Sequence, residues 1–502
     1  MTDVRDIGLM LGAKTPLLLL ETHDEMRALE TIQRAISEAS VSERGRLRSR
    51  PVYRWTITEG LVRLGFGSTE GVSPATNAQQ EPEDVLRHIK TMSHPAVVVL
   101  CDFHPYLEGN PKTVRLLKDI ALAQSQNRHS VVLVSHALAL PPELSRIAAR
   151  FSLAMPTDEQ IMTIIREEAK LWSEKGQRVK ADNETLARMV SNLRGLSFAD
   201  VRKLVHSAIV DDGAITESDL PNVNKAKFEL LNLDGVVSFE FDTASFAEVG
   251  GLVKLKQWLN SRQQAFTDHS IKDKPKGVML LGVQGSGKSL AAKAVAGLWG
   301  LPLLRLDFGA LYNKFHGESE RNLREALALA ERMSPCVLWM DELEKGIASE
   351  SSDGGTSKRL LGSLLTWQAE RKQPVFVVAT ANDISALPPE LMRKGRLDEI
   401  FFVDLPQANI REDIFAIHLK RRGLEKLLIQ LPILAAAAEG FSGAEIEQSI
   451  VSAIYTSRAQ GEVCGVQQIL RELANTNPLS VIMAEKIGSL RAWAQERCVM
   501  AD

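Results

Sequence analysis

Short apolar runs alternate with amphipathic stretches along the second half of the chain. Between the runs, Ser319–Met333 has apolar residues at helical spacing, and Gly362–Ala369 belongs to another helix. This alternation is typical of a parallel α/β sheet. The runs predict five buried strands: Val278–Leu281, Pro302–Leu306, Cys336–Met340, Val375–Ala379 and Ile400–Val403. No strand pattern recurs after Pro406, so we expect a helical tail of Gln407–Arg422, Leu431–Ala438, Ser442–Arg458 and Pro478–Arg497.

The first half repeats this plan more faintly. Helical patterns run from Asp158 to about Ile209. Leu140–Leu144 (LPPEL) is identical to Leu387–Leu391, and Gly195–Val201 resembles Gly440–Ile446, at offsets of 247 and 245 residues. Two matches at nearly one offset indicate an internal duplication. The strands expected here are Leu17–Leu20, Val52–Thr56, Val97–Cys101, Val131–Val134 and Phe151–Ala154.

Polar segments divide these patterns into regions. Asp211–Ser245 is polar and partly acidic, and we expect it to link the two halves. Gly67–Asp84 has little apolar content and is expected to be a surface insertion. The predicted organisation is an α/β domain over 1–156, a helical lid-like region and linker over 157–240, a second α/β domain over 241–405 and a helical lid with a C-terminal helix over 406–502.

Composition excludes several classes of protein. Of 502 residues, 44% are hydrophobic and 25% are charged, which argues against long disorder or a low-complexity scaffold. The formal net charge of −3 makes a wholesale polyanion binder improbable. The four cysteines lie far apart, without metal-ligand spacing. No apolar run approaches the ~20 residues that span a bilayer, so we expect a cytoplasmic protein without membrane contact.

One glycine-rich loop follows a predicted strand and precedes a helix. Gly282-Val283-Gln284-Gly285-Ser286-Gly287-Lys288-Ser289 fits GxxxxGK[ST], and Leu290 follows it directly. In such a loop, backbone N–H groups wrap phosphates at a helix N-terminus. Lys288 would reach the β- and γ-phosphates, and Ser289 would ligate Mg²⁺. The sequence therefore predicts a nucleotide site.

Two carboxylates end the third predicted strand of this half. Buried unpaired charge is costly, so Asp341 and Glu342 after Cys336–Met340 are expected to serve chemistry. Asp341 would hold Mg²⁺, through a water molecule, and Glu342 would polarise the attacking water. Together with the loop they predict ATP hydrolysis, with ATP and Mg²⁺ as cofactors.

Further motifs in the same order give a family resemblance. Phe246–Gly251, Lys314–Glu320 and Arg393–Asp398 resemble the entry motif, the aromatic pore loop and the arginine-finger segment of the AAA ATPase module. The resemblance spans about 246 to 460 and points to the clade of proteasomal ATPases and membrane-bound AAA proteases. It implies a P-loop AAA fold, a five-stranded parallel sheet plus a helical lid, preceded by a degenerate AAA-like α/β domain. Gly354–Arg359 and Thr476–Ser480 also resemble the Ycf-type AAA proteins of chloroplast and bacterial genomes.

The resemblance also implies individual roles. Asn382 matches the first sensor, which orients the hydrolytic water. Arg393 and Arg396 would act on the nucleotide of a neighbouring subunit, so the chain is expected to form a homo-oligomeric ring, a hexamer. The nucleoside would be contacted by Val249, Gly250, His418, Gly443 and Ala444. The loop that grips protein substrate would be Lys314, Phe315, His316 and Gly317, with His316 in place of the aliphatic residue commoner there.

The first half lacks these features. Its first strand leads into Glu21–Glu25 (ETHDE), which has no glycine and three acids. Asp102 is kept, but Phe103 stands where the catalytic glutamate would be, and Ser135 where the sensor Asn382 would be. We expect no ATP hydrolysis in this half, which would serve as a structural tier or docking platform.

Three functions stay open. The first is an ATP-driven ring that remodels, unfolds or disassembles protein partners through Phe315. The second is a regulatory ATPase, an activase-like chaperone of a metabolic or photosynthetic complex. The third is a nucleic-acid-linked ATPase that uses Arg44, Arg46, Arg48 and Arg50, for which a solvated edge segment is the plainer interpretation.

Overall fold

The chain forms two compact units, which are described separately. One comprises Met1–Glu159 with Ser197–Lys203, and the other comprises Gln160–Leu196 with Leu204–Asp502. The computed structural model describes residues 2–13, 15–42, 50–65, 80–174, 179–231, 236–241, 249–268, 271, 273–311, 318–347, 354–384, 387–393 and 395–502.

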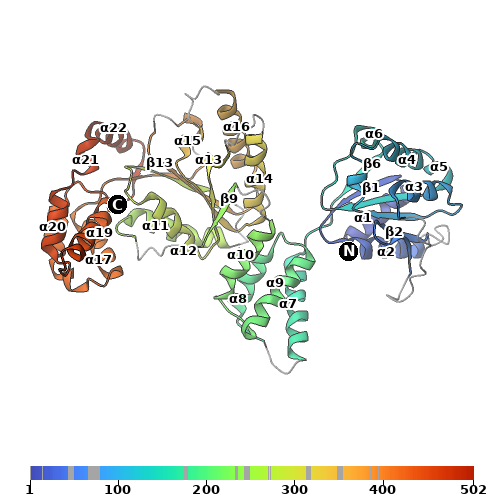
Figure 1. The fold of residues 1–502 in the computed structure, drawn as a ribbon, viewed down its shortest axis with the longest axis horizontal. Coiled ribbons are helices and arrows are strands. Elements are labelled where there is room, and N and C mark those ends of the chain that lie inside the picture. Colours follow the sequence, from blue (N-terminus) through green and yellow to red (C-terminus); the bar gives the residue numbers. More distant parts are fainter. Residues whose placement is uncertain are drawn as a thin grey trace. The chain divides into compact units, whose positions relative to one another are not determined.

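The first unit is built around a mainly parallel sheet with helices on both faces (Figure 1). Its strand order is β3-β2-β4-β5-β1-β6, and β3 alone among these strands pairs antiparallel, with β2. Helices α1 and α2 pack on one face, while α3 and α4 pack on the other. The elements are α1 Thr2–Gly12, β1 Leu17–Glu21, α2 Glu25–Ser42, β2 Val52–Thr56, β3 Gly60–Leu64, α3 Pro82–Thr91, β4 Val97–Cys101, η2 His104–Tyr106, α4 Pro111–Leu122, α5 Gln124–Asn127, β5 Ser130–Ser135, α6 Pro142–Ser145 and β6 Ala148–Phe151.

Four of the five strands predicted here are confirmed, and the fifth was misplaced. The predicted strand Phe151–Ala154 is in fact β6, Ala148–Phe151. It is an edge strand whose residues are only half-buried, so no apolar run marks it. The hairpin strand β3 was not predicted. The expected insertion Gly67–Asp84 lies mostly outside the described residues, and α3 begins within it at Pro82.

Four helices follow the first sheet. They are α7 Asp158–Ser173, α8 Asn183–Leu193, α9 Phe198–Asp212 and α10 Asp219–Leu231, with the short strands β7 Lys180–Ala181 and β8 Ala214–Ile215. The segment Asp211–Ser245, which we expected to link the two halves, contains the packed helix α10. Lys227 of α10 is 1% exposed, and its Nζ donates to the backbone oxygens of Asn192 (2.9 Å) and Arg194 (2.6 Å) at the end of α8. The polar composition hid this helix because its buried lysine is satisfied by carbonyls.

The second unit contains a larger sheet with the order β15-β14-β10-β13-β12-β11-β9. The five predicted strands form its centre, but the described residues add one short strand at each edge. These are β9, antiparallel to β11, and β15, parallel to β14. Strand β9 alternates apolar and polar residues (VSFE), and β15 has two residues, so neither gives an apolar run. The prediction of a five-stranded sheet was therefore incomplete, and β15 is a strand after Pro406. The strands are β9 Val237–Glu240, β10 Gly277–Gly282, β11 Leu303–Leu306, β12 Cys336–Met340, β13 Val375–Ala381, β14 Glu399–Val403 and β15 Val499–Met500.

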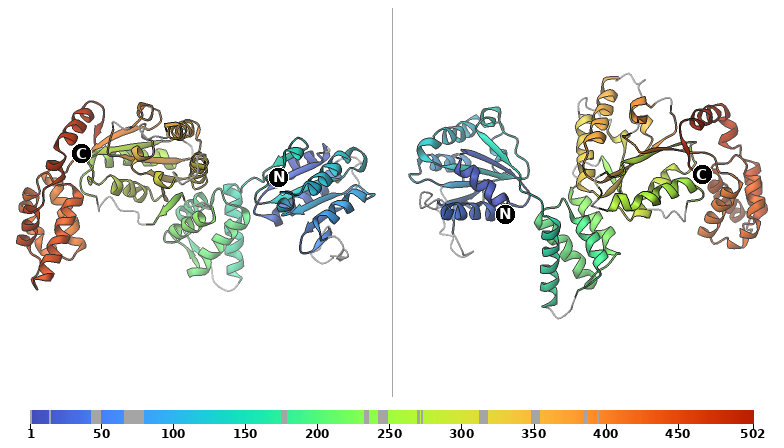
Figure 2. Two further views of the ribbon diagram at one scale, coloured as in Figure 1. Left: turned by 45° about the horizontal axis from the view of Figure 1, so that its top comes forward. Right: turned by 180° about the vertical axis from the view of Figure 1, so that it is seen from behind.

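Helices cover both faces of this sheet as well (Figure 2). Helices α11 Val253–Thr267 and α12 Lys288–Trp299 pack on one face. Helices α14 Glu318–Arg332 and α16 Gly354–Glu370 pack on the other, where α13 Phe308–Leu311 and α15 Leu343–Ile347 also lie.

A separate apolar core holds the helical tail together. It is formed by α17 Ala408–Arg421, α18 Leu431–Ala437, α19 Gly443–Ala459 and α20 Val466–Ala474, with the 3₁₀ helix η5 Glu425–Gln430 packed against it. The predicted helix Pro478–Arg497 is broken at Met483 into α21 Leu479–Ile482 and α22 Ala484–Gln495. The 3₁₀ helix η4 Pro389–Met392 completes the unit.

Candidate nucleotide-binding site

The glycine-rich loop joins β10 to α12 at the carboxyl edge of the second sheet. Gly285 and Gly287 have φ angles of +76° and +94°, a backbone region that favours glycine. Helix α12 begins at Lys288, so the loop leads into a helix N-terminus. Free backbone N–H groups and the helix dipole favour an anion at this point.

The loop contains a buried lysine and a buried hydroxyl, and the hydroxyl has no hydrogen-bond partner among the described residues. Lys288 is 6% exposed, and its Nζ donates to the backbone oxygens of Gly282 (3.0 Å) and Val283 (2.6 Å). Burial lowers the pKa of Lys288 to about 8, an effect that nearby carboxylates reduce. The Oγ of Ser286 is buried without a hydrogen-bond partner among the described residues. An anion bound here would stabilise the charged lysine and give the hydroxyl a partner.

The carboxylate of Asp341 is engaged on both oxygens. Its Oδ1 accepts a hydrogen bond from the hydroxyl of Thr380 (2.7 Å), and its Oδ2 accepts one from Nη2 of Arg305 (3.2 Å). The Thr380 hydroxyl also accepts the backbone N–H of Glu342 (3.0 Å). Thr380 is 1% exposed, so this one buried hydroxyl aligns both acidic residues.

Glu342 faces the same cavity. Its Oε1 accepts a hydrogen bond from Nδ2 of Asn382 (3.2 Å), and its Oε2 pairs with the ammonium of Lys345. The hydrogen bond from Lys345 to Glu342 raises the pKa of Lys345. The backbone N–H of Asn382 donates to Oε1 of Glu344 (2.9 Å). The motifs in the sequence predicted that Glu342 and Asn382 belong to one site. They did not predict the contacts of Lys345 and Glu344, because a charged residue next to other charged residues gives no specific signal.

A cavity of about 400 Å³ brings most of the predicted residues together. Its lining includes Val249, Gly250, Gln284, Gly285, Ser286, Gly287, Lys288, Ser289, Leu290, Asp341, Glu342, Asn382, His418, Gly443 and Ala444. Gly282 and Val283 lie just before it, at the end of β10. Sequence reasoning missed five further lining residues: Thr380, Ile414, Ile417, Arg421 and Glu447.

Helices α17 and α19 of the helical tail also line the cavity. His418 lies 3.4 Å from Glu447, and Nη2 of Arg422 lies 2.7 Å from the same carboxylate. Burial lowers the pKa of His418, partly offset by Glu447. Glu447 and Arg421 lie one helical turn from predicted residues, at Gly443 and His418, and that spacing could have identified them.

The donor set suits a magnesium ion. The Ser289 side chain is exposed in the first turn of α12 and lines the cavity together with Asp341. Hydroxyl and carboxylate oxygens are ligands that Mg²⁺ prefers, and this ion usually keeps several waters. No group of three His, Cys, Asp or Glu residues in the described part of the chain is arranged to hold a metal ion. Residues Ser289 and Asp341 therefore fit a magnesium ion held jointly with nucleotide, rather than by a protein cage.

Some predicted residues do not line the cavity. Arg393 and Arg396 follow η4, and Nη1 of Arg396 donates to the backbone oxygen of Glu390. The predicted pore-loop residues Lys314, Phe315, His316 and Gly317 lie outside the described residues, as do Arg44, Arg46, Arg48, Phe246, Ala247 and Glu248.

The corresponding edge of the first sheet keeps one of these hydrogen bonds. The hydroxyl of Ser135 donates to Oδ1 of Asp102 at 2.8 Å, as Thr380 does to Asp341. Strand register agrees, since Cys101 pairs with Val134 as Met340 pairs with Ala379. Ser135 therefore corresponds to Thr380. The prediction that Ser135 matches Asn382 was wrong by two residues.

No phosphate loop joins β1 to α2 in the first sheet. The connection has three residues, and Oδ1 of Asp24 accepts the backbone N–H of Arg27 (3.2 Å) in the first turn of α2. A carboxylate from the chain itself thus occupies the helix end where a phosphate would bind. Phe103 is fully buried where Glu342 stands in the second sheet.

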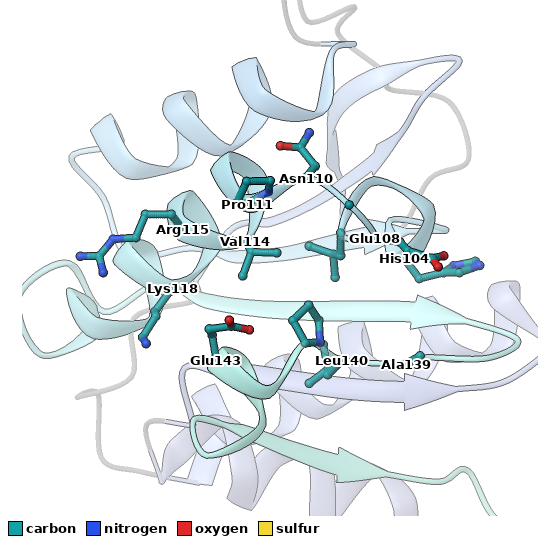
Figure 3. A pocket seen from close by; sticks show the side chains of 13 residues that line it. His104, Glu108, Asn110, Pro111, Val114, Arg115, Lys118, Ala139, Leu140 and Glu143 are labelled. Atoms are coloured by element: carbon teal, nitrogen blue, oxygen red, sulfur yellow. The ribbon is translucent and has the colours of Figure 1, made fainter.

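A larger hollow of about 670 Å³ lies in the first unit (Figure 3), and His104 of its lining has its Nδ1 3.0 Å from the hydroxyl of Ser135. Val114 of α4 and Leu140 of the segment that precedes α6 belong to its apolar part, and Leu107 also lines it. Charged side chains, including Arg115, Lys118 and Glu143, surround it. It has no glycine-rich loop at a helix start, so size alone does not identify the nucleotide site.

Comparison with known families covers most of the chain. A model of the SpoVK-like AAA ATPase N-terminal domain matches residues 4–153, and a model of the second domain of the same proteins matches 159–234. The model of the ATPase family associated with various cellular activities (AAA) matches residues 278–405.

Curated proteins give concordant relatives. The uncharacterized AAA domain-containing protein ycf46 of Guillardia theta is 34% identical over 98% of this chain and 95% of its own length. The ycf46 protein of Pyropia yezoensis is 34% identical over 98% of both chains. The proteasome-activating nucleotidase of Aeropyrum pernix is 37% identical over 38% of this chain and 47% of its own length. Among the described residues, no helix is both long and apolar enough to cross a bilayer.

Proposed function

Because this chain belongs to the AAA ATPase family, in the group of the ycf46 AAA domain-containing proteins, we propose that it hydrolyses ATP to ADP and phosphate. The observation that supports this best is one cavity lined by Lys288, Asp341, Glu342 and Asn382. A phosphate-binding loop, a metal-site carboxylate and a general base are the parts that phosphoryl transfer requires.

Each group has a role that its contacts support. The loop and Lys288 bind the phosphates. Glu342 accepts a proton from the attacking water, and Asn382, which donates to Glu342 Oε1 at 3.2 Å, orients that carboxylate. Val249, Gly250, His418, Gly443 and Ala444 contact the nucleoside.

The magnesium ion would be held by Ser289 directly and by Asp341 through water. When bound, Mg²⁺ neutralises charge on the β- and γ-phosphate oxygens. The protein's contribution is to fix Asp341, which Thr380 and Arg305 engage from both sides.

A Glu342→Gln variant tests this assignment. We expect ATP binding within about threefold of wild type and turnover reduced by at least about 100-fold, because the amide cannot accept the proton. Fluorescent-nucleotide binding and phosphate release measure the two effects. Glu370→Gln, at the exposed end of α16, is the matched control and should keep full activity. Normal turnover in Glu342→Gln would contradict the role of the base.

We further propose a homo-oligomeric ring, a hexamer, in which Arg393 and Arg396 reach the nucleotide of the neighbouring subunit. Neither arginine lines the cavity of its own chain, which supports this placement. An arginine finger contributes roughly 10³–10⁵ in rate. Arg396→Ala in assembled rings should therefore bind ATP but scarcely hydrolyse it, and full activity would exclude the role.

The substrate we propose is a protein client that the ring remodels in the cytoplasm, gripped by Lys314, Phe315, His316 and Gly317. Sequence relation to the proteasome-activating nucleotidases supports this class of function.

Loss of remodelling in Phe315→Ala with ATPase activity kept would support threading. Unchanged remodelling would favour the regulatory, activase-like ATPase. ATPase stimulation by nucleic acid, lost with the Arg44–Arg50 charges, would favour the third candidate. The domain boundaries at 156, 240 and 405 remain part of this proposal.

A further inference from the structure

Arg305 lies beside the metal-site carboxylate without having been expected there. It is in β11, paired with Trp339 of β12, and Asp341 is two residues further along the same strand direction. Its Nη2 lies 3.2 Å from Oδ2 of Asp341. Arg305 is the charged residue of the predicted strand Pro302–Leu306, and its role so far is only to help hold Asp341 in place.

The Arg305 side chain is 39% exposed, and the rest of its guanidinium lies against Trp339. Its Cζ lies 4.8 Å from the centre of the Trp339 ring, within cation–π range. Its Nε is buried without a hydrogen-bond partner among the described residues. An arginine that leaves one buried donor unsatisfied in order to reach a carboxylate indicates that the carboxylate needs a cation.

Asp341 has no other cation within ion-pair distance in the described part of the chain. Its side chain is 18% exposed, and Thr380 supplies only a neutral hydroxyl to the opposite oxygen. A mostly buried carboxylate without a counter-ion is costly, so Arg305 stabilises the site before metal arrives. A divalent cation brought by nucleotide would then meet an oxygen that is already engaged.

We propose that Arg305 is the resident counter-ion of Asp341 and competes with magnesium for that carboxylate. Arg305 therefore sets the Mg²⁺ concentration at which the nucleotide site fills. This rests on the proposed function, since it concerns how the same site responds to its metal. Arg305 touches neither substrate nor the general base and is a positioning residue.

The test compares Arg305→Met, which removes the charge but keeps the length, with Arg305→Lys, which keeps the charge. Arg262→Met is the matched control, because Arg262 also stacks on a tryptophan, Trp258, at 3.7 Å, but lies on α11 away from the carboxylates. The binding of fluorescent ADP is titrated at increasing free Mg²⁺. Thermal unfolding of the nucleotide-free proteins is measured alongside.

We expect Arg305→Met to need about three- to tenfold less Mg²⁺ for half-maximal ADP binding, with Arg305→Lys and Arg262→Met close to wild type. The nucleotide-free Arg305→Met protein should unfold at a lower temperature, and Mg²⁺ with ADP should recover more of its stability than in wild type. An unchanged or higher Mg²⁺ requirement would overturn the proposal.

Two outcomes keep the inference separate from the proposed function. Failure of wild type itself to bind ADP at any Mg²⁺ concentration would contradict the nucleotide site. Normal ADP binding with an unaltered Mg²⁺ requirement in Arg305→Met would contradict the role of Arg305 alone. If Arg305→Met does not fold, Arg305→Gln gives the same comparison with a neutral donor.

Discussion

At the residue scale, Thr380 links the two acidic residues on which the proposed chemistry depends. Its hydroxyl donates to Asp341 Oδ1 and accepts the backbone N–H of Glu342, at 2.7 and 3.0 Å. A partner that orients an active-site ligand typically contributes 10- to 100-fold in activity or metal affinity. Thr380 precedes Asn382 by two residues in an apolar strand, where a single threonine gives no signal of such a role.

We predict that Thr380→Val lowers ATP turnover by about 10- to 100-fold, because Asp341 loses a donor and the Glu342 N–H loses its acceptor. ADP affinity at saturating Mg²⁺ should change much less. Steady-state phosphate release and fluorescent-nucleotide binding measure the two quantities. Thr380→Ser keeps the hydroxyl and should restore most of the rate; a serine variant as slow as valine would show that packing, and not the hydroxyl, matters.

At the scale of elements, the close approach of neighbouring strands fixes where the phosphate loop begins. A Cβ added to Gly282, at the end of β10, would lie 2.0 Å from the backbone oxygen of Val403 in β14. The glycine thus serves strand packing as much as the loop that follows it. By contrast, a Cβ on Gly362 in α16 would meet no atom within 4 Å.

These two glycines make a matched pair. Gly282→Ala should lower the free energy of unfolding of the second unit by more than about 2 kcal/mol, because backbone cannot yield to the new methyl group. Gly362→Ala should raise it by about 0.5–1 kcal/mol, because alanine loses less entropy in a helix. Chemical denaturation followed by circular dichroism compares them. Equal stability of the two variants would contradict the packing argument.

At the scale of the whole molecule, two sheets of similar plan differ in the loop that follows their phosphate-site strand, β1 in the first and β10 in the second. In both sheets an aspartate accepts a hydrogen bond from a hydroxyl: Asp102 from Ser135, and Asp341 from Thr380. Only the second has a glycine-rich loop, while in the first Asp24 occupies the end of α2. The duplication predicted from sequence would account for the shared plan, and loss of the loop from one copy would account for the difference.

We therefore predict one nucleotide per chain. Isothermal titration calorimetry of wild type with ADP and Mg²⁺ should give a stoichiometry near one, and Lys288→Ala should remove binding altogether, because the first unit adds no site. Lys118→Ala, at the hollow of the first unit, should leave the stoichiometry unchanged. A second class of sites that persists in Lys288→Ala would show that the first sheet still binds nucleotide.

Apolar runs and motif spacing were enough to predict the central strands of both sheets, the family, and the glycine-rich loop with its two neighbouring carboxylates. Buried strands need contiguous apolar runs, and a phosphate loop needs glycines at fixed spacing, so both are local signals. Strands β6, β9 and β15 were missed or misplaced because edge strands bury too little to leave such a run.

The residues that contact those motifs became apparent only from the folded chain. Arg305 and Thr380 come from two different strands, and no spacing in the chain relates them to Asp341. The helix α10, hidden in a polar segment, is packed because carbonyls at the end of α8 satisfy Lys227. Contacts between residues far apart in the chain leave no periodic pattern in the sequence, because they depend on how separate helices and strands pack.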